Sequence, residues 1–442
     1  MKILFAVHHF PPTYRGGAEW RAHRTARALL ALGHEVGAVC VESIDSGDGQ
    51  EITFEDDVYD GVPIRRLSLN LSDVPDPVRY GYRNPLIGQC IEELLSSFRP
   101  DVLHLIGGYL MSGSTIEAAQ AAGVPVVLTL TDFWFLCPRI TLVHSDGTLC
   151  TTPADPLACA LCLRKEHRRY RLPDQLSGAA FGRVLSFIWQ RNHDGLLGAL
   201  RERKEYLLAL LNTVDLVISP SHFLKGLFEA QGVSPCRFVY MRQGLDMQNW
   251  ADAGPKQSDS HIRIGYIGQI AKHKGVDVLV EAFRHVRAGE KQPQLILYGD
   301  ADRFPRFSGW LRKRVANRKD VIFAGRFEHS QIGRIHAGID VLVVPSVWYE
   351  NSPNVILEAF ATGTPVVVSR LGGMAELVAD GVNGFQFEAG DSRDLARVLQ
   401  RFVDQPSLST NLRQSMPSVK TALEEVEDLL RLYAALEVKG LV

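Results

Sequence analysis

Short apolar runs alternate with longer amphipathic stretches along most of the chain. Lys2–Val7 fits a buried strand, Ala18–Leu32 has helical spacing of its apolar residues, and Glu35–Val41 fits the next strand. A loop with the glycine pair Gly16-Gly17 separates the first strand from the helix. This order of elements predicts a doubly wound α/β sheet, in which ligands bind at the carboxyl ends of the strands.

The first alternating set extends to about residue 250. Its further strands are expected at Val62–Leu67, Val102–Ile106, Val124–Leu130, Asp215–Ser219 and Val239–Arg242. The regular pattern is lost between residues 133 and 211, which we interpret as an insertion. Gln243-Gly244-Leu245-Asp246 fits a domain end, and residues 251–260 have the composition of a linker.

A second alternating set follows this linker. Its strands are expected at Ile262–Ile267, Gln294–Tyr298, Val321–Ala324, Val341–Val344 and Val366–Ser369, and one of its helices at Val276–Ala288. We therefore predict one domain at residues 1–250, a second at 260–405, and a C-terminal helical segment at 406–442. Apolar residues at helical spacing predict that this segment packs against a core, namely Leu423, Val426, Leu429, Leu430 and Tyr433.

Composition limits the class of protein. The chain has 442 residues, of which 46% are hydrophobic and 22% charged, and its net charge of −2 gives no reason to expect nucleic-acid binding. No apolar run approaches the roughly 18 residues of a membrane-spanning helix. Met1–Val7 is too short for a signal peptide. These features favour a cytoplasmic globular protein.

The second half contains a polar cluster at a predicted helix start. Glu350 precedes Ser352, which suits the N-cap position, and Pro353, which suits the first helical position. Asn354 and Glu358 are four residues apart and therefore share one face of the helix. Either glutamate alone would be interpreted as a solvated surface charge.

A longer pattern surrounds this cluster. From Ser346 to Glu376 the chain reads Ser-x-x-x-Glu-x-x-x-Asn-x-x-x-Glu-Ala-x-Ala-x-Gly-x-Pro-Val-x-x-Ser-x-x-Gly-Gly-x-x-Glu, and near the N-terminus it reads Phe10-x-Pro12-x-x-x-Gly16-Gly17-x-Glu19. The sequence resembles the retaining glycosyltransferases of family four, the glycosyl transferases group 1, along nearly all of its length outside residues 133–211. The resemblance implies the GT-B fold, in which two Rossmann-like domains face a cleft.

The resemblance also implies an activity and a site. It implies transfer of a sugar from a nucleoside-diphosphate sugar to a saccharide or lipid-linked acceptor, without a catalytic metal, in polysaccharide or glycoconjugate biosynthesis. The catalytic residues would be Glu350, Lys274 and Asp132. The donor-binding residues would be Gly16, Gly17, Gln269, Lys274, Glu350, Asn354, Val355, Glu358, Gly372 and Gly373. A lysine suits phosphate charge, and a carboxylate such as Glu358 can accept from two ribose hydroxyls at once.

Two positions depart from the family pattern. Gln269 stands where the family usually has arginine, and Thr131 precedes Asp132 where the family often has histidine. These departures motivate a second hypothesis, a non-catalytic partner subunit that binds a sugar nucleotide. An epimerase or phosphorylase on the same scaffold is a third, because a fold does not fix a function.

Four cysteines gather in the insertion, at Cys137, Cys150, Cys159 and Cys162. In a cytoplasmic protein this spacing favours a structural zinc site; disulfides, an iron–sulfur cluster or ordinary buried thiols are the alternatives. Asp300-Ala301-Asp302 spells the D-x-D of metal-using transferases, but we interpret it as an accidental match in a loop.

The most basic stretch, Arg164–Arg171, follows these cysteines. A solvated face is the simpler interpretation. A peripheral contact with the inner face of the cell membrane, or with an anionic acceptor, is the alternative, supported by the apolar residues Phe181, Leu185, Phe187, Ile188 and Trp189 nearby.

Overall fold

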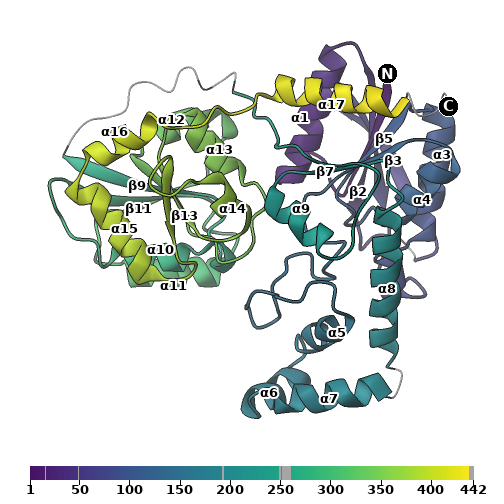
Figure 1. Cartoon of the computed structure of the whole chain (residues 1–442), viewed down its shortest axis with the longest axis horizontal. Helices are drawn as coiled ribbons and strands as arrows, with labels where there is room; N and C mark the ends of the chain where they lie inside the picture. Colours follow the sequence, from purple (N-terminus) through teal and green to yellow (C-terminus); the bar gives the residue numbers. More distant parts are fainter. Residues whose placement is uncertain (15, 48, 192–193, 248–249, 251–259, 438–442) are drawn as a thin grey trace. The chain divides into compact units, whose positions relative to one another are not determined.

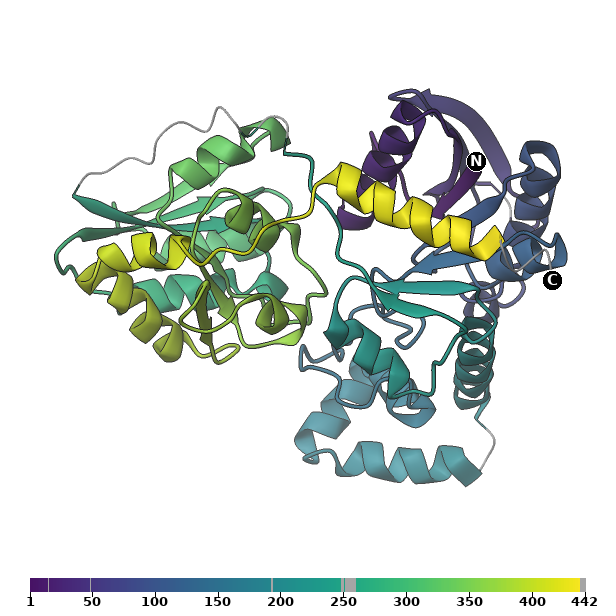
Figure 2. The same cartoon turned by 45° about the horizontal axis from the view of Figure 1, so that its top comes forward.

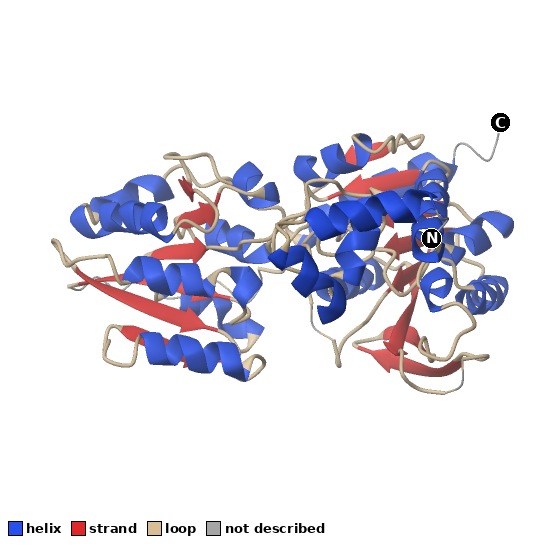
Figure 3. Ribbon diagram, turned by 90° about the horizontal axis from the view of Figure 1, so that it is seen from below, coloured by secondary structure: helices blue, strands red, loops and turns tan. Residues whose placement is uncertain are grey.

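The computed structural model describes all residues except 15, 48, 192–193, 248–249, 251–259 and 438–442, and it divides into two compact units (Figure 1). The first unit contains Met1–Gln243 and Ala422–Val442, and the second contains Gly244–Thr421. In each unit the strands lie between helices (Figure 3). Two α/β domains are thus confirmed, and the first unit leaves off at Gln243, whereas the predicted first domain extended to residue 250. Most of the predicted linker lies outside the described residues.

The described residues of the first unit form an eight-stranded sheet of order β3-β4-β2-β1-β5-β6-β7-β8. The strands are β1 Lys2–Val7, β2 Glu35–Ser43, β3 Thr53–Tyr59, β4 Val62–Ser68, β5 Val102–Ile106, β6 Val126–Thr129, β7 Leu216–Ser219 and β8 Phe238–Tyr240. All neighbours are parallel except β3, which pairs antiparallel with β4. Sequence analysis missed β3 because nearly all of its side chains are exposed. The order reverses between β1 and β5.

The helices of the first unit are α1 Gly17–Ala31, α2 Pro77–Tyr80, α3 Pro85–Phe98, α4 Ser114–Ala121, α5 Pro156–Arg164, α6 Arg168–Leu176, α7 Ala180–Arg191, α8 Gly195–Leu211, α9 His222–Glu229 and α17 Ala422–Glu437. In the insertion predicted as irregular, most of the described residues from Pro156 onward therefore belong to the helices α5 to α8. Its first helix starts where the Asp155 side chain accepts hydrogen bonds from the N–H groups of Leu157 and Ala158, both at 2.9 Å. Before Pro156 the insertion is a loop.

The last helix returns to the first unit. Val426, Leu429 and Tyr433 of α17 join the core formed by β1 and α1, and Figure 2 shows α17 beside α1. Arg21 donates from Nε to Glu425 Oε1 at 2.8 Å, and both side chains are buried. The predicted C-terminal segment 406–442 is thus divided in the structure. Its residues up to Thr421 belong to the second unit, and the apolar face of α17 completes the core of the first.

The described residues of the second unit form a parallel sheet of order β11-β10-β9-β12-β13-β14. Its strands are β9 His261–Ile267, β10 Gln292–Tyr298, β11 Val321–Gly325, β12 Val341–Val344, β13 Val366–Ser369 and β14 Gly384–Phe387. Its helices are α10 Val276–Phe283, α11 Pro305–Arg314, α12 Ile332–Ala337, α13 Asn354–Ala361, α14 Gly372–Leu377, α15 Ser392–Asp404 and α16 Ser407–Arg413. The strand order reverses between β9 and β12, so ligands are expected at the carboxyl ends of these two strands.

In the part of the chain that the structure describes, no helix has both the length and the apolar character that crossing a membrane requires.

Candidate functional site

The loops after β9 and β12 are held together at the point where the strand order reverses. Val347 N–H donates to the carbonyl oxygen of His273 at 3.0 Å. Gly275 follows the short 3-10 turn Lys272–Lys274 with a φ of +68°, and a Cβ there would lie 1.8 Å from the Pro345 carbonyl oxygen. Only glycine allows both this backbone conformation and this close approach. The contact sets the position of Lys274.

Three donors converge on one oxygen of Glu350. Oε1 accepts hydrogen bonds from Lys274 Nζ at 2.6 Å, Trp348 Nε1 at 2.8 Å and Ser346 Oγ at 2.9 Å. The other carboxylate oxygen takes part in none of these three bonds, and 14% of the side chain is exposed. Two of the residues predicted to act together are therefore in direct contact.

The surroundings keep the Glu350 carboxyl ionised. Burial alone would raise its pKa, but the positive charge and hydrogen bond of Lys274, with the bonds from Trp348 and Ser346, outweigh burial and lower the pKa. The neighbouring His273 has a lowered pKa because burial and the Lys274 charge both disfavour its protonation. The site thus combines one fixed anion with one fixed cation.

Helix α13 carries Asn354, Val355 and Glu358, and Glu358 is 6% exposed. Asn354 is the first helical residue, so the predicted start was wrong by one residue. Pro353 has an extended ψ of 122° and occupies the N-cap position, and no side chain caps the helix. Asn354 and Glu358 still lie one turn apart, because the shift moves only the helix boundary.

The glycines after β13 fix the backbone around Glu350. Gly373 N–H donates to the Glu350 carbonyl oxygen at 2.8 Å, and a Cβ on Gly373 would lie 1.7 Å from the Asn351 carbonyl oxygen. Gly372 has a φ of +56°. The N–H of Gly373 is therefore engaged within the protein, and its predicted place among the donor-binding residues stays a prediction.

Gln269 also has a role in its loop. Its carbonyl oxygen accepts a hydrogen bond from the buried Tyr266 hydroxyl at 2.6 Å. Gly268 precedes it with a φ of +150°. The backbone of this loop is thus anchored whatever side chain stands at position 269.

In the first unit, Gly16 is the N-cap of α1 and Gly17 its first residue. The carboxylate of Glu19 folds back over this helix start, since a Cβ on Gly16 would lie 2.4 Å from Glu19 Oε2. Glu19 also pairs with His8 at 3.4 Å. Burial would raise the Glu19 pKa, but the bond and charge of His8 lower it. Sequence analysis did not identify this pair, although Glu19 belongs to the quoted N-terminal pattern.

Asp132 holds a turn after β6. Its Oδ1 accepts from Trp134 N–H at 2.8 Å, and its Oδ2 accepts from Thr131 Oγ1 at 3.3 Å. Burial raises the pKa of Asp132 despite these bonds. Asp132 belongs to the first unit, whereas Glu350 and Lys274 belong to the second, so their cooperation stays a prediction.

The D-x-D sequence lies in the loop after β10, as expected. Asp300 Oδ1 accepts from Asp302 N–H at 2.8 Å, and Oδ2 pairs with Arg326 at 2.9 Å. Asp300 thus stabilises its own turn.

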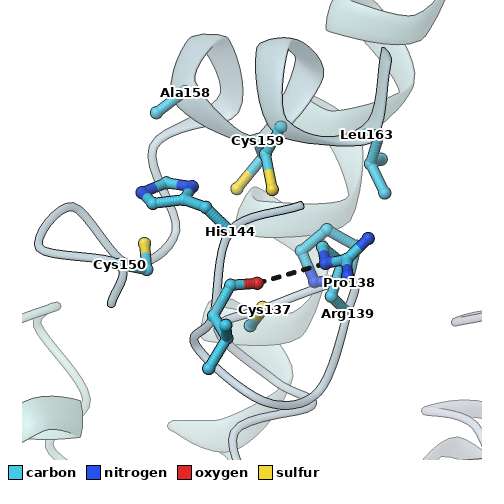
Figure 4. A pocket seen from close by; sticks show the side chains of 10 residues that line it. Cys137, Pro138, Arg139, His144, Cys150, Ala158, Cys159 and Leu163 are labelled. Atoms are coloured by element: carbon cyan, nitrogen blue, oxygen red, sulfur yellow. Dashed lines mark hydrogen bonds between the residues drawn. The ribbon is translucent and has the colours of Figure 1, made fainter. Parts of the chain in front are cut away.

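The four cysteines of the insertion line one small cavity together with His144 (Figure 4). All are free thiols. Burial raises the pKa of Cys159 to about 12. Across the described residues, no group of three or more His, Cys, Asp or Glu side chains is placed so that it could hold a metal ion. The predicted zinc site therefore remains a prediction.

The basic stretch is partly neutralised within the insertion. Arg164 donates to both carboxylate oxygens of Asp194 at 2.8 and 2.7 Å, and Lys165 pairs with Asp174 at 2.6 Å. Arg168 and Arg169 are exposed at the start of α6. Helices α6 and α7 also carry exposed apolar side chains, namely Leu172, Leu176, Val184, Phe187 and Ile188.

Comparisons with known proteins agree with the geometry. Residues 261–405 match the sequence family described as "Glycosyl transferases group 1", and residues 16–244 match the "Glycosyl transferase 4-like domain". Glycogen synthase of Mycobacterium tuberculosis is 24% identical, with 92% of this chain and 87% of that protein covered. The GDP-mannose-dependent alpha-mannosyltransferase of Corynebacterium glutamicum is 22% identical, with 89% and 78% covered.

Solved structures share the fold at low identity. Sucrose-phosphate synthase from Thermosynechococcus elongatus has a TM-score of 0.66 at 17% identity, with 99% of both chains covered. Anabaena HepE in complex with UDP and glucose has a TM-score of 0.63 at 17% identity, with 98% of this chain and 100% of that chain covered.

Proposed function

This chain belongs to the group 1 glycosyltransferases, and from this premise we propose a metal-independent, retaining transfer of a sugar from a nucleoside-diphosphate sugar. The acceptor would be a saccharide or a lipid-linked saccharide in polysaccharide or glycoconjugate assembly. The bond between the anomeric carbon and the diphosphate breaks, and a bond to the acceptor oxygen forms on the same face of the sugar. The acceptor proton passes to the departing phosphate, so no protein nucleophile is required.

The observation that carries this proposal is the Lys274–Glu350 pair at the carboxyl ends of β9 and β12. As a cation, Lys274 would stabilise the charge that develops on the diphosphate. Glu350 directs one oxygen to three protein donors, which leaves the other outside these bonds and able to accept from a sugar hydroxyl. The lowered pKa keeps this acceptor ionised at neutral pH.

The ribose would be bound from α13. Glu358 is four residues beyond Asn354 on this helix, and a carboxylate can accept from both ribose hydroxyls. We expect Glu358→Gln to raise the dissociation constant for the donor at least about tenfold, because it replaces a charged acceptor by a neutral one. Isothermal titration of UDP and GDP measures this, with Glu388→Gln as control. Unchanged affinity would place the nucleotide elsewhere.

The reaction is tested with a panel of UDP-, GDP- and ADP-sugars. A thermal-shift screen first identifies the donor, because a ligand that binds only the folded state raises its stability. The donor is then incubated with saccharide acceptors, and the anomeric configuration of the product is read by NMR. A product of retained configuration in the presence of chelator supports the proposal. Binding without turnover supports the partner-subunit alternative, and phosphate-dependent cleavage of a glycan supports the phosphorylase.

We further propose that α6 and α7 contact an anionic membrane surface when the acceptor is lipid-linked. Four arginines are exposed on these two helices, namely Arg168, Arg169, Arg183 and Arg191. The helices also carry exposed apolar side chains, among them Leu176 at the end of α6, which is 87% exposed, and those of α7. Arginine near an anionic surface contributes about 1 kcal/mol per residue, and apolar side chains add insertion energy. Any zinc held by the neighbouring cysteines would shape this segment and take no part in transfer.

Vesicle sedimentation tests this surface. We expect binding to phosphatidylglycerol vesicles that salt weakens, little binding to phosphatidylcholine, and a loss of several-fold in Phe187→Ser/Ile188→Ser. Val58→Ser, which changes an exposed apolar residue on β3, is the control. The proposal would be contradicted if Phe187→Ser/Ile188→Ser and Val58→Ser bound the vesicles equally well. It would also be contradicted if the protein of natural sequence did not bind them.

A further inference from the structure

The segment from Pro156 to Arg191 has little hydrophobic core of its own. Throughout this range, all of which the structure describes, Ala160 and Trp189 are the buried apolar side chains apart from glycine. Segments with so small a core are commonly fixed by disulfides or a structural metal. All seven cysteines are free thiols in the structure.

Four cysteines from three backbone segments converge beside this range. Cys137 ends the loop after β6, Cys150 follows the bridge between Val143 and Leu149, and Cys159 and Cys162 lie one turn apart on α5. They line a cavity of about 20 Å³. Figure 4 shows the side chains of Cys137, Cys150 and Cys159 around this cavity. A space of this size holds a single water-sized particle, and therefore one metal ion.

The backbone at these cysteines is already fixed. Cys137 N–H donates to the Phe133 carbonyl at 2.7 Å, Cys150 N–H to the Leu142 carbonyl at 2.8 Å, and Cys159 N–H to the Asp155 carbonyl at 2.9 Å. Ala154 N–H also donates to the Leu136 carbonyl at 3.0 Å, which ties the start of α5 to the loop of Cys137. Only the side chains remain to be gathered around an ion.

A buried cation beside the cysteines lacks a matching carboxylate. Arg203 of α8 is 6% exposed and lines a second cavity together with Cys159. Its guanidinium donates to the Trp134 carbonyl oxygen, and its electrostatic partners among the described residues are the thiols of Cys137 and Cys159 and the hydroxyl of Tyr82, with no carboxylate. A buried charge without an opposite charge is costly. Zinc with four thiolates carries a net charge of −2 and would supply that opposite charge.

We propose that Cys137, Cys150, Cys159 and Cys162 bind one zinc ion as four thiolates and thereby fasten α5 to the loop after β6. Each thiol loses its proton to solvent as its sulfur–zinc bond forms. The side chains are not at coordinating positions in the described structure. Zinc–sulfur bonds of about 2.3 Å place the sulfurs about 3.8 Å apart, and one rotamer change moves a cysteine sulfur by about 3 Å. Zinc binding therefore requires rotation of the cysteine side chains.

Metal analysis of the full chain, purified without chelator, tests the proposal. We expect about one zinc per chain, retained in Cys236→Ser and Cys90→Ser and lost in Cys159→Ser/Cys162→Ser. Cys236 is exposed and Cys90 is a buried cysteine on α3, so they control for thiol loss in either environment. Absence of metal from the natural sequence under reducing conditions, or iron with labile sulfide in place of zinc, overturns it.

A second measurement does not depend on folded variants. Cobalt exchanged into the natural protein should show the thiolate-to-metal charge-transfer bands and the d–d bands of a tetrahedral four-sulfur site. Removal of the metal by a chelator should make proteolysis within residues 156–191 several times faster and leave cleavage of the second unit unchanged. Octahedral cobalt spectra, or equal proteolysis with and without metal, would overturn the proposal.

Discussion

At the scale of single residues, the Oε1 atom of Glu350 joins the two loops of the candidate site. It accepts from Lys274 of the β9 loop and from Ser346 and Trp348 of the β12 loop. Burial would favour the neutral acid, so the carboxylate depends on these donors to remain charged. The lysine therefore helps to keep its neighbour ionised, and under the proposed function it would also be the cation for phosphate.

Replacing Lys274 by methionine should reduce kcat/KM for sugar transfer about 100-fold, a typical loss for one stabilising donor at a transition state. The same change should raise the pKa of Glu350, because burial then acts with less opposition. The acid limb of the pH–rate profile should consequently move to higher pH. Lys272→Met, which removes an exposed cation from the same loop, is the control. If the acid limb did not move in Lys274→Met, the acid limb would not report the pKa of Glu350.

At the scale of elements, α17 is held to the first sheet by a buried polar contact as well as by apolar packing. His104 of β5 lies 2.6 Å from the Tyr433 hydroxyl through Nδ1 and 2.7 Å from Thr129 Oγ1 through Nε2. Burial lowers the pKa of His104 to about 3. The imidazole is therefore neutral in the folded protein at neutral and mildly acidic pH.

This histidine should make the first unit less stable in acid. Its folded pKa of about 3 lies below the ordinary value of 6.5, so the unfolded chain binds the extra proton between these values. Above about pH 6.5 this difference in pKa does not affect the free energy of unfolding. As the pH falls below 6.5, it lowers the free energy of unfolding by up to about 1.4 kcal/mol per pH unit. Urea unfolding at pH 7.0 and 5.5 should show a smaller loss in His104→Asn, whose amide can still reach Tyr433. Equal losses in both proteins would contradict the assignment.

At the scale of the whole molecule, the chain leaves the first unit at Gln243 and returns to it at Ala422. Val426, Leu429, Tyr433 and Leu436 then complete a core that begins with Ile3. Burial of four such side chains contributes roughly 8 kcal/mol, which is comparable with the whole stability of a domain. The first unit therefore cannot form fully until the second has been synthesised.

Deleting residues 422–442 should accordingly destabilise the first unit and leave the second intact. Hydrogen exchange should show loss of protection in β1 and α1, with protection in β9 and α13 unchanged. Nucleotide affinity of the second unit should be retained within about threefold, since Lys274, Glu350 and Glu358 all lie within it. Deletion of residues 438–442 alone is the control. Retained protection of β1 in the longer deletion would show that α17 is dispensable.

The sequence by itself determined the two alternating sets and most of the strands, because buried parallel strands are continuous apolar runs. It also indicated Glu350 and Glu358 through a long spaced pattern, and Lys274 through the family resemblance. It did not show β3, whose exposed side chains carry little apolar signal. It also did not show the helices of the insertion, where several apolar residues of α6 and α7 are exposed.

Only the tertiary structure decided which distant residues meet. The hydrogen bond between Lys274 and Glu350 joins positions 76 residues apart, and the Arg21–Glu425 pair joins positions 404 apart. The engagement of Gly373 N–H by Glu350 and the approach of Gly275 to Pro345 likewise depend on how two loops pack. Periodicity reports the environment of an element along the chain, whereas these contacts depend on strand order, which a local pattern does not contain.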